Sequence, residues 1–152
     1  MPALDLGGVY GSGYCGYGFR LGYSWRDYLL FEGEYSHYLD VHESHTQSLF
    51  LAGIRAGLRK RRLGAFVKLQ PGMIRAVKSY YLHYPDFTKF KFALSAGGVA
   101  EGHLGSHTYV RFDLGYLVIW YGDATLNFDG GSPLRPGTSL HPHWSIGVGF
   151  RL

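Results

Sequence analysis

The sequence has little of what most function classes require. It contains one cysteine, Cys15, so an internal disulfide cannot form. It has no run of about 18 apolar residues, which excludes a membrane-spanning helix. No phosphate-binding glycine motif, no nucleophile elbow and no convincing helical periodicity occur. The first residues, MPALDLGG, also lack the basic start and apolar run of a secretory signal peptide.

Glycine and aromatic residues are abundant instead. The 152 residues include 23 Gly, 13 Tyr and 10 Phe, and this glycine content is roughly twice the usual share of about 7%. The mean hydropathy is nevertheless nearly neutral, at −0.08. Strands with one apolar and one polar face combine these features, because the two faces cancel in a hydropathy average.

The last stretch, HPHWSIGVGFRL (residues 141–152), shows two such faces most clearly. Successive side chains of a strand point to opposite faces. One face carries Trp144, Ile146, Val148 and Phe150, and the other carries histidine, serine, glycine and Arg151. The apolar face could cover the core of a soluble sandwich, or it could face lipid.

The length of the predicted strands favours an apolar face that contacts lipid. The alternation recurs, giving seven predicted strands at about residues 14–25, 28–38, 47–59, 63–75, 90–102, 107–121 and 141–152. A tilted strand needs about 9–11 residues to cross a bilayer, whereas strands of globular domains usually have about 5–6. We therefore predict an all-β fold, an antiparallel up-and-down transmembrane β-barrel with seven clear strands in this chain and eight when intact.

The connections support this topology. Short turns near residues 26–27, 60–62 and 104–106 alternate with long loops at 40–46, 76–89 and 122–139. Outer-membrane barrels have short turns on the periplasmic side and long loops outside. The pair Pro71-Gly72 predicts a bulge or bend within its strand.

Seven is an odd number, and single-chain bacterial barrels have an even one. We therefore expect residues 1–13 to be an extracellular loop or the remnant of a first strand, with residues 14–152 forming the outer-membrane barrel. On this interpretation a first strand and a signal peptide are missing upstream. The alternative is that residues 4–13 supply a short eighth strand.

The stretches GYGFRLGYSW (16–25), LLFEGEYSHY (29–38), SLFLAGIRAGLRKRRLGAFVKLQPG (48–72) and SIGVGFRL (145–152) resemble a known family. It is the small eight-stranded outer-membrane barrels of Gram-negative bacteria, in the OmpA-like or opacity-protein group. The resemblance implies insertion into the bacterial outer membrane by the barrel-insertion machinery, and a structural or adhesive role. Membrane lipids and lipopolysaccharide are the expected partners, and the extracellular ligand is unknown.

The alternation assigns side chains to three environments. The residues expected to face lipid are Phe19, Leu21, Phe31, Phe50, Ile54, Leu58, Val67, Leu69, Phe92, Leu94, Phe112, Leu114, Ile146, Val148 and Phe150. The aromatic residues expected at the membrane interfaces are Tyr23, Trp25, Tyr28, Trp120, Tyr121 and Trp144. The residues expected to form an ion-pair network that plugs the lumen are Arg20, Glu32, Glu34, Arg55, Arg59, Lys68, Arg111, Asp113 and Arg151.

Other functions stay open as alternatives. A small conducting pore would use the same lumen charges. A lipid A-modifying enzyme would need a Ser/His/acid group, for which Ser36, His37 and Glu43 are candidates by sequence proximity. A lipocalin-like carrier would turn the apolar faces inward. We predict no catalytic, cofactor-binding or metal-binding residues, although His141 and His143 share a strand face. The basic turn at residues 60–62 fits anionic headgroups better than nucleic acid.

Overall fold

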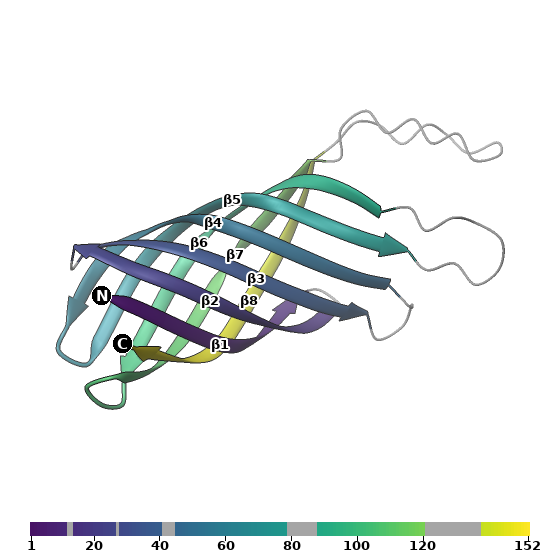
Figure 1. Ribbon diagram of the computed structural model, residues 1–152. Coiled ribbons are helices and arrows are strands. Elements are labelled where there is room, and N and C mark those ends of the chain that lie inside the picture. Colours follow the sequence, from purple (N-terminus) through teal and green to yellow (C-terminus); the bar gives the residue numbers. More distant parts are fainter. Residues whose placement is uncertain (12–13, 27, 41–44, 79–87, 121–137) are drawn as a thin grey trace, which may run out of the picture.

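The described residues fold into a closed barrel of eight antiparallel strands (Figure 1). The computed structural model describes residues 1–11, 14–26, 28–40, 45–78, 88–120 and 138–152. The strands are β1 (Pro2–Gly11), β2 (Tyr14–Arg26), β3 (Leu29–Asp40), β4 (His45–Lys60), β5 (Leu63–Lys78), β6 (Thr88–His103), β7 (Thr108–Trp120) and β8 (Thr138–Arg151). Each pairs with the next, and β1 pairs with β8. Within these residues, no helix is long and apolar enough to span a bilayer.

The expectation that the first strand is missing is wrong. Residues 2–11 form β1, which pairs with β2 on one side and β8 on the other. The alternative, a short strand within residues 4–13, agrees better with the observed β1. Glycines interrupt the alternation of side chains in this strand. A Cβ at Gly7 would lie 2.5 Å from the carbonyl oxygen of Ile146, so the close approach of β1 to β8 requires glycine there.

The other seven strands lie where the alternation predicts them, with ends that differ by a few residues. Pro71 causes no bulge, because the register of β5 with β6 runs unbroken through it. The shift in register lies instead between Ser24 and Arg26 of β2. The β1–β2 connection, residues 12–13, is short, so the alternation of short turns and long loops does not extend to it.

The barrel has two distinct ends. The start of β1, the end of β8 and the β4–β5 and β6–β7 turns gather at one end, which we name the turn end (Figure 1). The ends of β3, β5 and β7 define the opposite loop end. By the rule for outer-membrane barrels, the turn end is periplasmic and the loop end faces outside.

Burial alternates along the strands as the two-faced pattern requires. On β7, each buried residue from Tyr109 to Ile119 is flanked by more exposed ones. The buried set points into the barrel and includes nine charged residues of the strands. Large apolar side chains cover the outside, the arrangement of a protein solvated by lipid and not that of a lipocalin-like carrier.

Candidate functional site in the barrel lumen

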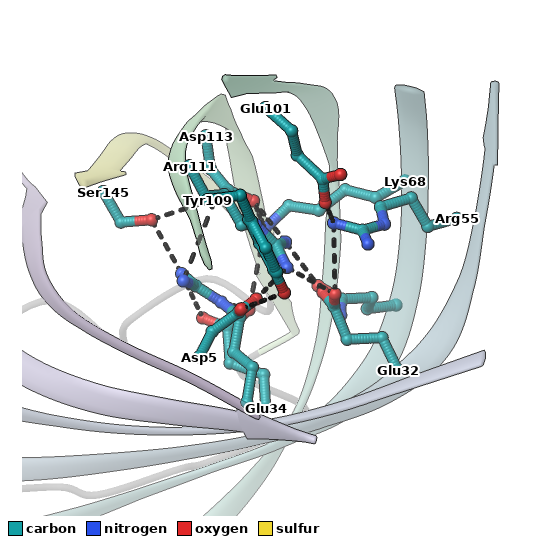
Figure 2. Close-up of polar contacts among 12 residues, drawn as sticks. Asp5, Glu32, Glu34, Arg55, Lys68, Glu101, Tyr109, Arg111, Asp113 and Ser145 are labelled. Atoms are coloured by element: carbon teal, nitrogen blue, oxygen red, sulfur yellow. Dashed lines mark hydrogen bonds and ion pairs between the residues drawn. The ribbon is translucent and has the colours of Figure 1, made fainter. Parts of the chain in front are cut away.

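Charged side chains from seven of the eight strands meet in the middle of the lumen (Figure 2). Their exposed fractions lie between 0% and 6%. The cations are Arg20, Arg55, Lys68 and Arg111, and the anions are Asp5, Glu32, Glu34, Glu101 and Asp113. Buried charges are costly unless paired, so the pairing pattern determines what this site can do.

Arg111 of β7 is the centre of one cluster. Its guanidinium donates to Glu32 of β3 and to Asp113, each at 2.8 Å, and also to Asp5 of β1 at 2.8 Å. The Tyr109 hydroxyl donates a short hydrogen bond to Asp5. A guanidinium has five N–H donors in a planar fork, which lets this one side chain serve three carboxylates from three strands.

Arg20 and Lys68 form the adjoining cluster. Arg20 pairs with Glu34 at 2.9 Å and donates to the Ser145 hydroxyl of β8 at 2.7 Å. The Lys68 ammonium lies 2.9 Å from Asp113 and 3.6 Å from Glu34. Asp113 therefore joins this cluster to the one around Arg111, and the combined network ties β1, β2, β3, β5, β7 and β8 together.

Glu101 of β6 organises a third cluster nearer the turn end. It pairs with Arg55 at 2.8 Å, Arg59 at 3.2 Å and Arg151 at 3.3 Å. The Arg55 guanidinium lies 4.7 Å from the centre of the Phe66 ring, a distance typical of cation–π contacts. Three arginines thus share one carboxylate, with an aromatic face as additional support.

Apolar side chains cover the ionic layer on the loop-end side. The buried cluster there comprises Val9, Tyr38, Leu49, Leu51, Ile74, Ala93, Leu117 and Ile119. A smaller cluster of Leu30, Phe66 and Val99 lies toward the turn end. The ionic layer is therefore covered by apolar side chains on its loop-end side, whereas the Glu101 cluster surrounds the smaller apolar cluster and reaches the turn end.

One glycine makes room for the Asp5–Tyr109 pair. A Cβ at Gly149 of β8 would overlap both the Asp5 carboxylate and the Tyr109 ring. A larger residue at this position would separate the hydroxyl from its acceptor. Gly149 therefore leaves space for the Asp5 carboxylate and the Tyr109 ring.

The structure places all nine predicted lumen residues in these clusters. Seven are buried, whereas Arg59 and Arg151 are partly exposed at the turn end. The sequence reading missed two carboxylates. Asp5 lay in the stretch interpreted as a loop, although the alternation of Leu4 and Leu6 around it was a signal. Glu101 has the inward phase of the strand predicted at residues 90–102, but it was not among the predicted lumen residues.

The enzyme candidates do not come together in the described residues. Ser36 is fully buried inside the barrel, whereas the neighbouring His37 lies on the outward face of β3. Glu43 lies outside the described residues. His141 contacts the Ser139 hydroxyl at 2.8 Å and His143 is buried, and within the described ranges no group of three potential ligands could hold a metal ion.

The outward surface carries the residues expected to face lipid. Fourteen of the fifteen have exposed fractions between 41% and 78%, and Leu94 is partly buried. Of the predicted interface aromatics, Tyr23, Trp25 and Tyr28 lie outward near the turn end and Trp120 at the loop end. Trp144 lies opposite Leu114, near the middle of β7, because β8 begins at Thr138 and not at residue 141. Tyr121 lies outside the described residues.

Comparison with known proteins reveals likeness in structure. The N-terminal β-barrel domain of Pseudomonas aeruginosa OprF matches with a TM-score of 0.63 and 14% identity, over 98% of this chain and 95% of that domain. Neisserial surface protein A matches with a TM-score of 0.65 and 15% identity, over 99% and 96%. The Yersinia pestis attachment invasion locus protein Ail matches with a TM-score of 0.59 and 14% identity, over 99% and 97%.

No protein-family model matches the sequence. No curated protein matches it either. At identities this low, the structural likeness is one of fold, that of the small eight-stranded outer-membrane barrel. The apolar outer surface and the strand lengths of 10–16 residues agree with that fold. Together they place the chain in an outer membrane.

Proposed function

We propose that this outer-membrane β-barrel is a closed structural scaffold that holds its loop-end segments at the cell surface for interaction with other molecules. The observation that carries the proposal is the paired ionic layer of the lumen, sealed by an apolar cluster on the loop-end side. A conducting pore needs a continuous wet path, and these side chains leave little exposed surface along the axis.

Charge pairing is the first reason to expect a closed lumen. Glu32 and Asp113 each contact more than one cation, and Arg111 is fully buried. An ion that entered would have to displace a partner from a buried carboxylate or guanidinium. Breaking such a buried pair costs about 3–5 kcal/mol, which is a large barrier for each step of permeation.

Loop-end connections are the second part of the proposal. The sequence places residues 79–87 between β5 and β6 and residues 121–137 between β7 and β8. Long extracellular connections on a rigid barrel are where such proteins place their binding function. The names of two proteins with this fold, the neisserial surface protein and the attachment invasion locus protein, agree with a surface role.

Conductance across a planar bilayer tests the closed lumen. The wild-type protein, refolded and inserted, should give no stable conductance steps. The double variant Glu32→Ala/Arg111→Ala removes one paired anion and cation and should give small steps. The matched control Arg59→Ala, at the partly exposed turn end, should stay silent. Stable steps from the wild-type protein would refute the closed scaffold.

Segment replacement tests the surface role separately. We expect a variant with residues 121–137 replaced by a short Gly-Ser linker to fold and insert like the wild-type protein, as judged by the difference in gel mobility between heated and unheated samples. Binding of intact bacteria that express the barrel to host-cell or abiotic surfaces should then fall. Failure of the linker variant to fold would contradict a scaffold that is independent of this segment.

A further inference from the structure

Three polar residues interrupt the apolar outer surface. Away from the strand ends, the outward side chains that the structure describes are apolar, glycine, cysteine or aromatic, except for His37, Ser48 and Arg75. The three are direct neighbours, because His37 pairs with Ser48 and Ser48 pairs with Arg75. Lipid-facing polar groups are unfavourable in the hydrocarbon, so we expect the three residues to lie at the level of the polar headgroups.

Contacts within this polar row orient its members. His37 Nδ1 lies 3.1 Å from the Ser48 hydroxyl, and the Tyr17 ring lies 5.5 Å from the His37 ring. The Arg75 guanidinium lies 6.0 Å from the centre of the Phe90 ring, on the neighbouring strand. Arg75 is exposed toward the membrane side of the barrel. The row thus presents a guanidinium, an imidazole and a hydroxyl along one line.

The height of the row matches the outer headgroups. On β4, the outward positions from Phe50 to Leu58 are apolar, and polar side chains return only at Ser48 and Lys60. Twelve residues span about 40 Å along a strand, or about 30 Å along the axis at the usual tilt. That distance is close to the thickness of the hydrocarbon core, so Ser48 and Lys60 mark its two surfaces.

An apolar hollow lies on the hydrocarbon side of the polar row, beyond the Tyr35–Phe50 pair. It has a volume of about 650 Å³ and is lined by side chains of β2 to β5 that include Phe19, Gly33, Tyr35, Phe50, Ala52 and Met73. Small residues make it: Gly33 pairs with Ala52, between the larger pairs Tyr35–Phe50 and Phe31–Ile54. A Cβ at Gly33 would meet nothing within 4 Å, so the space above this glycine is open to the lipid.

We propose that the polar row and this hollow form one binding site for a phosphorylated, acylated lipid of the outer leaflet, the lipid A part of lipopolysaccharide. Arg75 binds the phosphate, since a guanidinium matches phosphate oxygens in charge and geometry. Ser48 and His37 add hydrogen bonds to the headgroup. One acyl chain lies in the hollow over Gly33 and Ala52. The site depends on the location in the outer membrane, but not on the closed lumen.

Two features favour lipid A over a phospholipid. The row lies toward the loop end, which faces outside, and in a Gram-negative outer membrane that leaflet is made of lipopolysaccharide. The site also extends across four neighbouring strands, from Tyr17 on β2 to Arg75 on β5, which suits a broad headgroup with several chains. A two-chain phospholipid headgroup would occupy only part of this width.

Native mass spectrometry of the refolded barrel in neutral detergent micelles tests the site. Titration with diphosphorylated lipid A should give one retained lipid on the wild-type protein. We expect Arg75→Gln and Gly33→Leu each to weaken retention at least fivefold, the first by removing the phosphate partner and the second by filling the hollow. Dephosphorylated lipid A should bind wild-type protein as weakly as lipid A binds Arg75→Gln.

Matched controls separate the site from general charge and surface effects. Lys60→Gln removes an outward cation at the opposite membrane surface, and Gly102→Leu fills another outward position with open space around it. Both should retain lipid A like the wild-type protein. All variants must show wild-type heat-dependent gel mobility, which reports folding.

Several results would overturn the proposal. One is an equal loss of lipid A retention in Lys60→Gln and Arg75→Gln. Another is unchanged retention of lipid A by Arg75→Gln or Gly33→Leu. A third is retention of phosphatidylglycerol that is as strong as that of lipid A. Displacement of lipid A by millimolar inorganic phosphate would identify a free-phosphate site and overturn it as well. A conducting wild-type barrel that retains lipid A would refute only the closed lumen.

Discussion

Removal of the Arg111 guanidinium is the sharpest test of the lumen network. In Arg111→Met the apolar side chain has a similar length, but Glu32, Asp113 and Asp5 lose the cation that contacts all three. Asp113 keeps Lys68 at 2.9 Å, whereas Glu32 keeps Arg55 at 3.5 Å and a hydrogen bond of 3.0 Å from the Gln70 amide. Removing one partner of a buried pair destabilises by about 3–5 kcal/mol, and we expect a loss in that range.

A double-mutant cycle separates the contribution of the Arg111–Glu32 ion pair to this loss from the contribution of lost packing. Glu32→Gln in the Arg111→Met background should cost less than Glu32→Gln alone, with a coupling of about 1–3 kcal/mol. Arg111→Lys keeps the charge but cannot serve three carboxylates, so its loss should be intermediate.

Urea unfolding in lipid bilayers measures these values. The fluorescence of the 3 tryptophans reports the transition, and the slope with urea must stay constant for the free energies to be compared. A loss below about 1 kcal/mol for Arg111→Met would refute the reasoning, because such a value is typical of an exposed pair. Additive effects of the two substitutions would do the same.

Three further substitutions use the same unfolding assay. Tyr109→Phe should lose about 1–3 kcal/mol, since Asp5 would keep a buried oxygen without its hydroxyl donor; no change would mean that the hydrogen bond contributes nothing. Ile54→Arg, midway between Ser48 and Lys60 on the outward face, should lose about 2–4 kcal/mol, whereas a loss near zero would place this residue outside the hydrocarbon. Gly149→Val should lower the free energy of unfolding by at least about 1–3 kcal/mol, because its side chain would overlap Asp5 and Tyr109. The control Gly102→Ala has nothing within 4 Å of the added Cβ, so its free energy of unfolding should stay within about 0.5 kcal/mol of the wild-type value. Equal losses from the two substitutions would contradict the account of Gly149.

The faces of the strands could be predicted from the sequence because a membrane barrel repeats one simple rule. Outward positions within the hydrocarbon core must avoid polar side chains, so the alternation around Phe112 or Ile146 indicates which side chains face outward. The same rule failed at β1. There, Gly7 and Gly8 stand where larger side chains would have shown the period, and Gly7 is required by the close approach of β8, which is distant in sequence.

Partners inside the lumen could not be predicted in the same way. The phase places Arg20 and Arg111 inside, but contacts such as Arg20 to Ser145 depend on which strands face each other across the barrel. That arrangement follows from closure and stagger, which alternation does not encode. The polar row was missed for a related reason: His37, Ser48 and Arg75 become neighbours only through the pairing of three strands.

The ionic layer contributes more to specificity than to net stability. The attraction within a buried ion pair roughly offsets the cost of removing its charges from water, so replacing the pair with apolar side chains often leaves stability unchanged. Their geometry still fixes the register. A slip of β7 by one residue would turn Arg111 and Asp113 toward lipid, and an arginine at the bilayer midplane alone costs about 2–4 kcal/mol. The slip would also break the pairs from β7 to Glu32 of β3 and Lys68 of β5. Because these partners lie on strands that are not adjacent to β7, the network disfavours slips that strand pairing alone would tolerate.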